Sequence, residues 1–301
     1  MYKIKTSLFV KQNSVECAFS DAASWVILNP IELSIKNKIE KVGVPLKDWD
    51  IKIYRGILTG CNEAFIISEQ KRNEILSWCR NESEKHRTDE LIRPILRGRD
   101  IKRYGYSFAN LYLIASHNGI PDKNIPRINI DEYPAVKRHL DQYWDKISKR
   151  ADMGDTPYNL RSCAYMDDFS KQKIIYPNMT KYLPFVFDPD GFATNQKCFI
   201  VTGHHIAYLT AFFNSSLFKY CFRDVFPELQ GGTRELSKIF FDKIPVMTVS
   251  EETNNFFESM VISLQKKGRD ITLEKEIDQR IFDLYGLSAQ EREQIGFYEI
   301  I

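Results

Sequence analysis

The sequence has no run of about 18 consecutive apolar residues, and so no segment of the length and composition of a membrane-spanning helix. Its first residues, Met1-Tyr-Lys-Ile-Lys-Thr6, alternate polar and apolar side chains and lack the apolar stretch of a signal peptide. We therefore expect a cytoplasmic protein.

Local metal-binding patterns are also missing. The six cysteines lie far apart and form no C-x-x-C pair, and the five histidines form no H-x-x-x-H or H-E-x-x-H pattern. A disulfide framework is unusual in a cytosolic chain of this size. We expect free, mostly buried thiols and no metal site.

The sequence lacks the motifs of three kinds of catalytic centre. It has no glycine-rich loop for a methyl donor and no Walker loop. The tetrapeptide of amino-methyltransferases, (N/D/S)-P-P-(Y/F), is approached only by Asn29-Pro-Ile-Glu32, which we interpret as a helix start because proline suits the first helical turn. A metal-dependent nuclease is disfavoured because the segment after Pro189-Asp190 has Asn195 where the metal carboxylate belongs. We expect no catalytic residue, metal or cofactor in this chain.

The patterns that are present predict an α+β protein, with a mixed β-sheet domain followed by a C-terminal helical region. A short hairpin is expected over 2–19. Further strands are expected at 51–58, 64–67, 109–115, 173–176, 184–187 and 197–201, and the last two should form a hairpin around the turn Asp188-Pro-Asp-Gly191. The expected helices are one from Pro30 to Gly43, then 69–79, 131–149, 204–213, 215–224, 251–267 and 272–285, with a last short helix after the capping box at Ser288. Residues 81–90 are expected to form an exposed polar connection. The predicted division is an N-terminal hairpin and helix (1–48), an α/β domain (49–248) and C-terminal helices (249–301).

Charge is distributed unevenly along the chain. The net charge is +2, but residues 251–301 carry eleven acidic and six basic side chains, so residues 1–250 carry a net charge of +7. A basic body with an acidic helical end is consistent with a surface that faces phosphates.

The densest group of cations lies between Arg93 and Arg103. Arginine is suited to bidentate contact with phosphates or guanine edges, and the candidate phosphate contacts are Arg97, Arg99, Lys102 and Arg103. The alternative is that some of these arginines pair internally, with Asp100 as the obvious partner.

Three further segments hold candidate contacts. Residues 171–197 interleave cations with aromatics and amides, and the candidates there are Lys173, Asn178, Lys181, Asn195 and Lys197. The alternative is a solvated sheet edge whose lysines discourage aggregation. The Gly231-Gly232 loop, with Arg234, could present backbone N–H groups to an anion or be a simple flexible turn. Thr59 and Asn62 are expected to shape a turn, and either could reach a phosphate backbone.

The order of several motifs resembles one family, the TaqI-like C-terminal specificity domain. The most specific are Gly56-Ile-Leu-Thr-Gly-Cys-Asn-Glu-Ala-Phe65 and Leu96-Arg-Gly-Arg-Asp-Ile101. Weaker landmarks, in the same order as in the family, are Trp25–Asn29, Tyr133–Leu140, Lys173–Pro177, Leu209–Ser215, Ile244–Val246 and Glu276–Leu287. The resemblance spans about residues 25–290, and the methyltransferase half of full-length members is absent from this chain.

This resemblance implies the target-recognition part of a type IIG or TaqI-like restriction-modification enzyme, which is a site-specific DNA adenine methyltransferase or type II restriction enzyme. Double-stranded DNA and a methyltransferase, with or without an endonuclease, would be the partners. S-adenosylmethionine would bind, and the target base would be flipped, in that other domain or subunit. The alternative from another class is a scaffold subunit of a phage-defence complex that docks a partner through its acidic C-terminal helices.

Overall fold

The computed structural model describes Ser14 and residues 28–298, so the expected hairpin over 2–19 lies outside the described residues. The helices are α2 (Pro30–Val42), α3 (Asn62–Phe65), α4 (Glu69–Ser77), α5 (Glu82–Leu91), α6 (Pro134–Asp141), α7 (Trp144–Ile147), α8 (Ile206–Asn214), α9 (Ser216–Phe222), α10 (Lys238–Phe241), α11 (Glu251–Lys267), α12 (Ile271–Leu284) and α13 (Ala289–Ile295). The strands are β1 (Gly43–Pro45), β2 (Ile51–Arg55), β3 (Ile66–Ser68), β4 (Ile92–Leu96), β5 (Leu111–Ile114), β6 (Lys173–Pro177), β7 (Met179–Thr180), β8 (Val186–Asp188), β9 (Ala193–Thr194), β10 (Cys198–Gly203), β11 (Arg234–Glu235) and β12 (Pro245–Met247).

A four-stranded antiparallel sheet in the order β2-β10-β6-β8 forms the middle of the molecule. Successive side chains of a strand point to opposite faces, and both faces of this sheet are buried. On β6, Ile174 and Tyr176 pack into one hydrophobic core while Ile175 between them packs into another. The sheet therefore separates two cores.

One core lies between the central sheet and the helices α2, α8, α9, α11 and α12. It is built largely from phenylalanine rings in mutual contact, among them Phe185, Phe213, Phe218 and Phe241. Because this one core takes side chains from α2, from the sheet and from α12, it crosses both of the boundaries predicted from the sequence, at 48 and 249.

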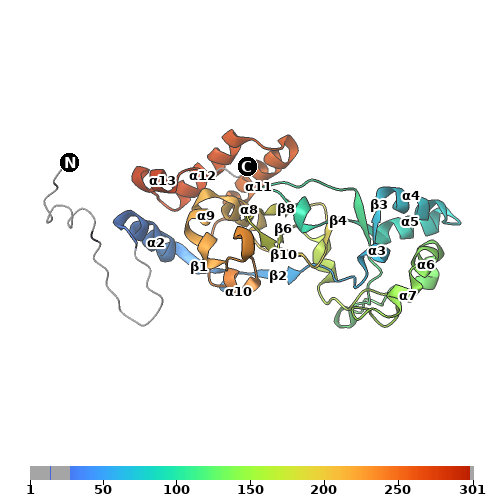
Figure 1. The fold of residues 1–301 in the computed structure, drawn as a ribbon. Coiled ribbons are helices and arrows are strands. Elements are labelled where there is room, and N and C mark those ends of the chain that lie inside the picture. The colour runs from blue at the N-terminus through green and yellow to red at the C-terminus, as the bar shows by residue number, and fades with distance from the viewer. Residues whose placement is uncertain (1–13, 15–27, 299–301) are drawn as a thin grey trace.

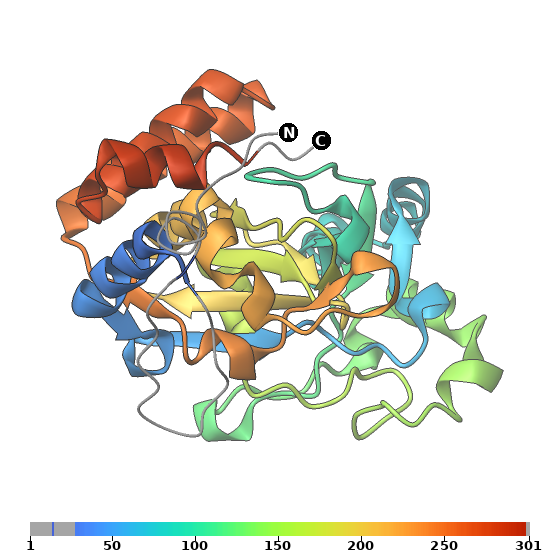
Figure 2. The ribbon, with the colours of Figure 1, turned by 60° about the vertical axis from the view of Figure 1, so that its left-hand side comes forward.

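The second core lies between the other face of the sheet and a lobe that holds helices α3–α7. This lobe contains a mixed sheet in the order β3-β5-β4-β9, in which β4 and β9 are parallel and the other pairs antiparallel. Figure 1 shows α3–α7 at the end of the molecule opposite to α2, α9 and α13, with β2, β6 and β10 between them. Figure 2 shows the C-terminal helices, in red, lying together on one side of the molecule.

The expected α+β class is confirmed, and so are the helix starts that rest on local capping. Asn29 caps α2 with a capping box that includes Glu32, and Ser288 forms the equivalent box with Glu291 at α13. Helix α11 has the predicted bounds. No helix in the described part of the chain is long and apolar enough to cross a membrane. The five cysteines among the described residues are all free.

Three expectations about local structure were wrong. Residues 81–90 form helix α5 rather than an exposed connection, because Asn81 caps it and a face marked by Glu84, Thr88 and Leu91 is buried. The expected helix 131–149 is interrupted, since α6 begins only at Pro134 and ends at Asp141, before α7. The strands on either side of the Asp188–Gly191 turn do not form a hairpin, because β6 lies between β8 and β10.

Helix α2 contacts the C-terminal helix α13 through hydrogen bonds to Glu291. The carboxylate of Glu291 accepts hydrogen bonds from Lys38 Nζ at 2.6 Å and from Ser34 Oγ at 2.7 Å, and its side chain is only 5% exposed. Burial by itself raises the pKa of Glu291, but the hydrogen bonds from Lys38, Ser288 and Ser34 outweigh burial and lower the pKa to about 2. The contact joins two elements far apart in sequence.

We expect Glu291→Gln to lower the free energy of unfolding by roughly 1–3 kcal/mol at pH 7, because the charged acceptor is lost. A depressed carboxyl pKa stabilises the folded state above the unfolded pKa of about 4.5, and this stabilisation is lost as the pH falls from there toward 2. Denaturant titrations of both proteins between pH 7 and pH 2 should therefore converge at the acid end. A difference between them that does not change with pH would contradict this role for Glu291.

Candidate nucleic-acid interface

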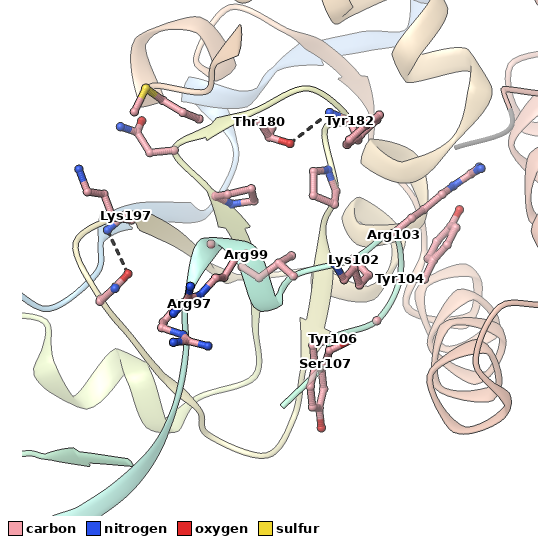
Figure 3. A pocket seen from close by; sticks show the side chains of 18 of the residues that line it. Arg97, Arg99, Lys102, Arg103, Tyr104, Tyr106, Ser107, Thr180, Tyr182 and Lys197 are labelled. Atoms are coloured by element: carbon pink, nitrogen blue, oxygen red, sulfur yellow. Dashed lines mark hydrogen bonds between the residues drawn. The ribbon is translucent and has the colours of Figure 1, made fainter. Parts of the chain in front are cut away.

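A cleft of about 1240 Å³ lies between the two lobes of the molecule and the C-terminal helices. Four segments supply most of its lining: the loop 97–107 after β4, the loop 177–184 after β6, residues 195–197 before β10, and the corner between α11 and α12. Figure 3 shows the loop that carries Arg97, Arg99 and Lys102 on one side and the segment that carries Thr180 and Tyr182 on the other. The cleft is thus assembled from parts of the chain that are distant in sequence.

The lining of the cleft is strongly cationic. Only Glu63 and Glu274 are acidic among its lining residues. Seven lining residues are basic, and these are Arg97, Arg99, Lys102, Arg103, Lys181, Lys197 and Arg269. Such an excess of positive charge in a concave surface attracts polyanions.

In the loop 97–107, neighbouring arginines have different environments. The Arg97 guanidinium donates to both carboxylate oxygens of Asp100, at 2.9 and 2.8 Å, which is the internal pairing that the sequence left open. Burial alone would raise the pKa of Asp100, but hydrogen bonds from Arg97 and the charge of Arg99 outweigh it and lower that pKa. Arg99 and Lys102 are exposed and make no ion pair or side-chain hydrogen bond within the described part of the chain. Asp100 therefore shapes the loop, and Arg99 and Lys102 point their charge outward.

Gly98 fits this loop tightly against the central sheet. A Cβ added there would lie 3.3 Å from Pro177 Cβ and 3.6 Å from the carbonyl oxygen of Lys197. The glycine thus permits close approach of the loop to the strands β6 and β10, rather than a sharp turn of its own.

Arg103 contacts the C-terminal helices instead of facing open solvent. Its Nη1 lies 2.9 Å from a carboxylate oxygen of Glu274 and donates to the carbonyl oxygen of Tyr298 at 2.8 Å, and its side chain is 6% exposed. The interpretation of Arg103 as a direct phosphate contact is wrong for this conformation, because the guanidinium is already buried in a protein contact.

The loop 177–184 and residues 195–197 face the cleft together. Lys181 and Lys197 are exposed and, like Arg99, have no ion pair among the described residues. The backbone N–H of Asn178 donates to the carbonyl oxygen of Lys197 at 2.8 Å, which joins the two segments. The Asn195 side chain is turned inward, since its Oδ1 accepts from the Lys197 N–H at 3.2 Å and the residue is 7% exposed. Asn195 therefore shapes this turn and is not available to read a base.

Two charged candidates, Lys173 and Arg234, do not line the cleft. Lys173 is fully buried in an ion pair with Asp188, with Nζ and Oδ2 2.6 Å apart. Arg234 is 7% exposed and is held by the carboxylates of Asp224 and Glu228 and by the carbonyl oxygen of Phe226. These two predictions are wrong because burial and internal pairing keep both side chains from an external ligand.

Thr59 and Asn62 shape a turn, as expected. Thr59 is 1% exposed and its hydroxyl donates to Asn62 Oδ1 at 2.6 Å. Asn62 lines the cleft, whereas Thr59 does not and is too deeply buried in this structure to meet an external ligand.

Nine of the twelve candidate residues line this one cleft, although the sequence placed them in separate segments. The sequence did not indicate that Gln265, Gly268 and Arg269, at the α11–α12 corner, would also line this cleft. Nothing in the spacing of the C-terminal helices indicates that their corner lies at the same cleft as the loop 97–107.

A family model describes the same region. The TaqI-like C-terminal specificity domain matches residues 93–246, which is just over half of the chain and includes most of the cleft lining. The chain belongs to the family of TaqI-like C-terminal specificity domains. The resemblance inferred from the sequence is confirmed, with a matched segment shorter than the 25–290 over which the motifs were compared.

The similarity to solved structures covers more of this chain than the specificity-domain match over residues 93–246. The type IIG restriction endonuclease BpuSI is 15% identical, with a TM-score of 0.52, over 85% of this chain and 32% of its own. The type IIL restriction-modification enzyme MmeI, solved in complex with DNA, is 12% identical, with a TM-score of 0.54, over 84% of this chain and 34% of its own. This chain therefore spans about a third of the length of either protein, and the likeness at this identity is one of fold.

Proposed function

We propose that this chain is the sequence-specific DNA-recognition module of a restriction-modification enzyme. The observation that carries the proposal is the cationic cleft, in which Arg99, Lys102, Lys181 and Lys197 come from three separate segments and have no ion pair with any residue that the structure describes. Membership of the specificity-domain family and the fold shared with BpuSI and MmeI support the same assignment.

The unpaired cations divide between two walls. Arg99 and Lys102 lie on the loop after β4, while Lys181 and Lys197 lie on the segments beside Asn178. Charged contacts to phosphates hold a duplex in register, and amides and lysines on loops can read base edges. We assign Arg99 and Lys102 to phosphates and keep Asn178, Lys181 and Lys197 as candidates for base contacts.

Chemistry on the DNA is assigned to another domain or subunit. Among the described residues there is no group of three or more His, Cys, Asp or Glu side chains that could hold a metal. A methyltransferase that binds S-adenosylmethionine and flips the target base is the proposed partner, and this chain would position the duplex for it.

We expect Arg99→Ala and Lys102→Ala each to flatten the dependence of DNA affinity on salt. The slope of log K against log salt should change by about 0.9 for each phosphate contact that is lost. The affinity of the full chain for a labelled duplex, measured by fluorescence anisotropy at several salt concentrations, gives this slope.

Lys36→Ala is a matched control for these two variants. Lys36 is half exposed on α2 and pairs with Glu40 away from the cleft, so its removal changes the net charge equally. Its slope should equal that of the unmodified chain. Slopes unchanged in Arg99→Ala and Lys102→Ala, with unchanged thermal unfolding, would reject the cleft as the DNA-binding surface and favour a scaffold role.

A further inference from the structure

The loop between β6 and β8 places two exposed apolar side chains in the cationic cleft. Tyr182 is 54% exposed and Met179 is 51% exposed, and both line the cleft. No ring contact, ion pair or side-chain hydrogen bond joins the Tyr182 side chain to another described residue. The ring is therefore free to meet a ligand.

The backbone on both sides of this ring is fixed by the fold. Before it, Met179 and Thr180 form β7 and pair with β11, and Leu236 donates its N–H to the carbonyl oxygen of Asn178 at 2.8 Å. The Tyr182 N–H itself donates to Thr180 Oγ1 at 3.1 Å, as Figure 3 shows. An ordered backbone that presents an aromatic ring to solvent loses little further entropy when the ring binds.

Leu183, the next residue, anchors the loop from the other side. It is 2% exposed in the core, and its φ of +49° lies in the left-handed region that leucine rarely adopts. Phe185 lies two residues further on. Its backbone N–H donates to Asn214 Oδ1 at 3.1 Å, and its carbonyl oxygen accepts from Asn214 Nδ2 at 2.7 Å. The fold thus holds an unfavourable backbone conformation whose effect is to bury Leu183 and leave Tyr182 outside.

The chemistry of the cleft identifies what this ring meets. Cations on the surrounding walls match phosphates, but an apolar ring among them matches the face of a nucleobase, which has no charge. In an intact duplex the base faces are covered by their neighbours, and they become accessible only where a base pair is opened or a step is unstacked. We propose that Tyr182, supported by Met179, stacks on a base where the duplex is locally opened in the cleft.

This inference rests on the proposed function and adds a contact that is not electrostatic. It makes Tyr182 a positioning residue for an opened base pair, whereas Arg99 and Lys102 act on phosphates. The two kinds of contact respond differently to salt, so one set of titrations separates them.

The test compares the full chain with Tyr182→Ala and Tyr182→Phe on two probes, a 25-base-pair duplex and the same duplex with one central mismatch. The unmodified chain should bind the mismatched duplex several-fold more tightly, because the mismatch lowers the cost of opening. Tyr182→Ala should bind that duplex about tenfold more weakly and lose the preference, with an unchanged salt slope. Tyr182→Phe, which retains the ring, should behave like the unmodified chain.

Phe256→Ala is the control for loss of an exposed ring, since Phe256 is 39% exposed on α11 and does not line the cleft. It should leave both affinities unchanged. The inference fails if Tyr182→Ala binds both duplexes like the unmodified chain, if Tyr182→Phe is equally weakened, or if the unmodified chain has no preference for the mismatch. If the unmodified chain binds neither duplex at low salt, the proposed function fails and this inference fails with it.

Discussion

Lys173→Met is expected to lower the free energy of unfolding by about 3–5 kcal/mol, because it leaves a buried carboxylate without its cation. The Lys173 and Asp188 side chains are 0% and 1% exposed, and Lys173 Nζ also donates to the carbonyl oxygen of Phe169 at 2.6 Å. Burial raises the pKa of Asp188, and the Lys173 charge opposes that rise. Without Lys173, folding must bury this carboxylate either charged and unpaired or neutral. Urea titration followed by circular dichroism measures the loss.

Lys171→Met provides the comparison for this prediction. Lys171 lies two residues earlier, is 56% exposed and pairs with Asp168 at 2.6 Å. Solvent around the exposed Lys171 ammonium screens this pair, but the Asp168 side chain is only 7% exposed, so this variant should lose some stability, though clearly less than Lys173→Met. Lys173→Met, Asp188→Asn should recover part of the stability, because the uncompensated charge is removed. A stable Lys173→Met variant with a flattened salt slope would instead restore Lys173 as a DNA contact.

The contrast between Lys171 and Lys173 shows why the sequence alone could not distinguish exposed lysines, which are candidates for DNA contact, from buried ones. Both lysines lie in a segment of mixed polar and apolar residues, and period two in a strand identifies alternate faces but not which face is exposed. Here both faces of β6 are buried, so Lys173 enters the protein interior with Asp188 as its partner. That partner belongs to a strand whose pairing was predicted wrongly.

Features that depend on a few neighbouring residues were predicted well. The capping residues Asn29 and Ser288 act within one helical turn, and α11 follows from its own periodicity. Strand order depends on packing between distant segments, and the sequence alone did not place β6 between β8 and β10. Helix α5 was also missed, because its buried face includes polar side chains such as Glu84 and therefore shows no apolar periodicity in the sequence.

For the site, the sequence predicted the kinds of side chain but not their environments. Three arginines of one short segment have three different environments. Arg97 pairs with Asp100, Arg99 is exposed, and the Arg103 side chain is buried against Glu274. Only the neighbour three residues away, Asp100, could be suspected beforehand. The partners of Arg103 come from the far end of the chain.

The C-terminal helices consequently have a part in the site as well as in the core. The α11–α12 corner lines the cleft, and α12 holds Arg103 through Glu274. Close to this pair lie Lys219 and Asp278, both buried. Burial and then the charge of Arg103 lower the pKa of Lys219 well below its usual range, and burial raises the pKa of Asp278. These two buried charges therefore lie beside the Arg103–Glu274 contact that joins the loop 97–107 to α12.

A double-mutant cycle on Arg103 and Glu274 distinguishes an anchor from a DNA contact. If the pair anchors the loop, Arg103→Met and Glu274→Gln should each destabilise the protein by about 3 kcal/mol, since each leaves a buried partner unsatisfied. Their effects should not add, with a coupling of about 1–3 kcal/mol in urea titrations. Both variants should weaken DNA binding alike, because Arg99 and Lys102 lose their common support.

The opposite result has a clear signature. If Arg103 served a phosphate in the bound state, Glu274→Gln would release its guanidinium and strengthen DNA binding, while Arg103→Met would flatten the salt slope by about 0.9. The structure favours the anchor, because Nη1 of Arg103 is shared between the Glu274 carboxylate and the Tyr298 carbonyl oxygen and the side chain is almost fully buried. DNA affinities that move in opposite directions in the two variants would overturn the anchor, and affinities that fall together would establish that the C-terminal helices position the cationic loop.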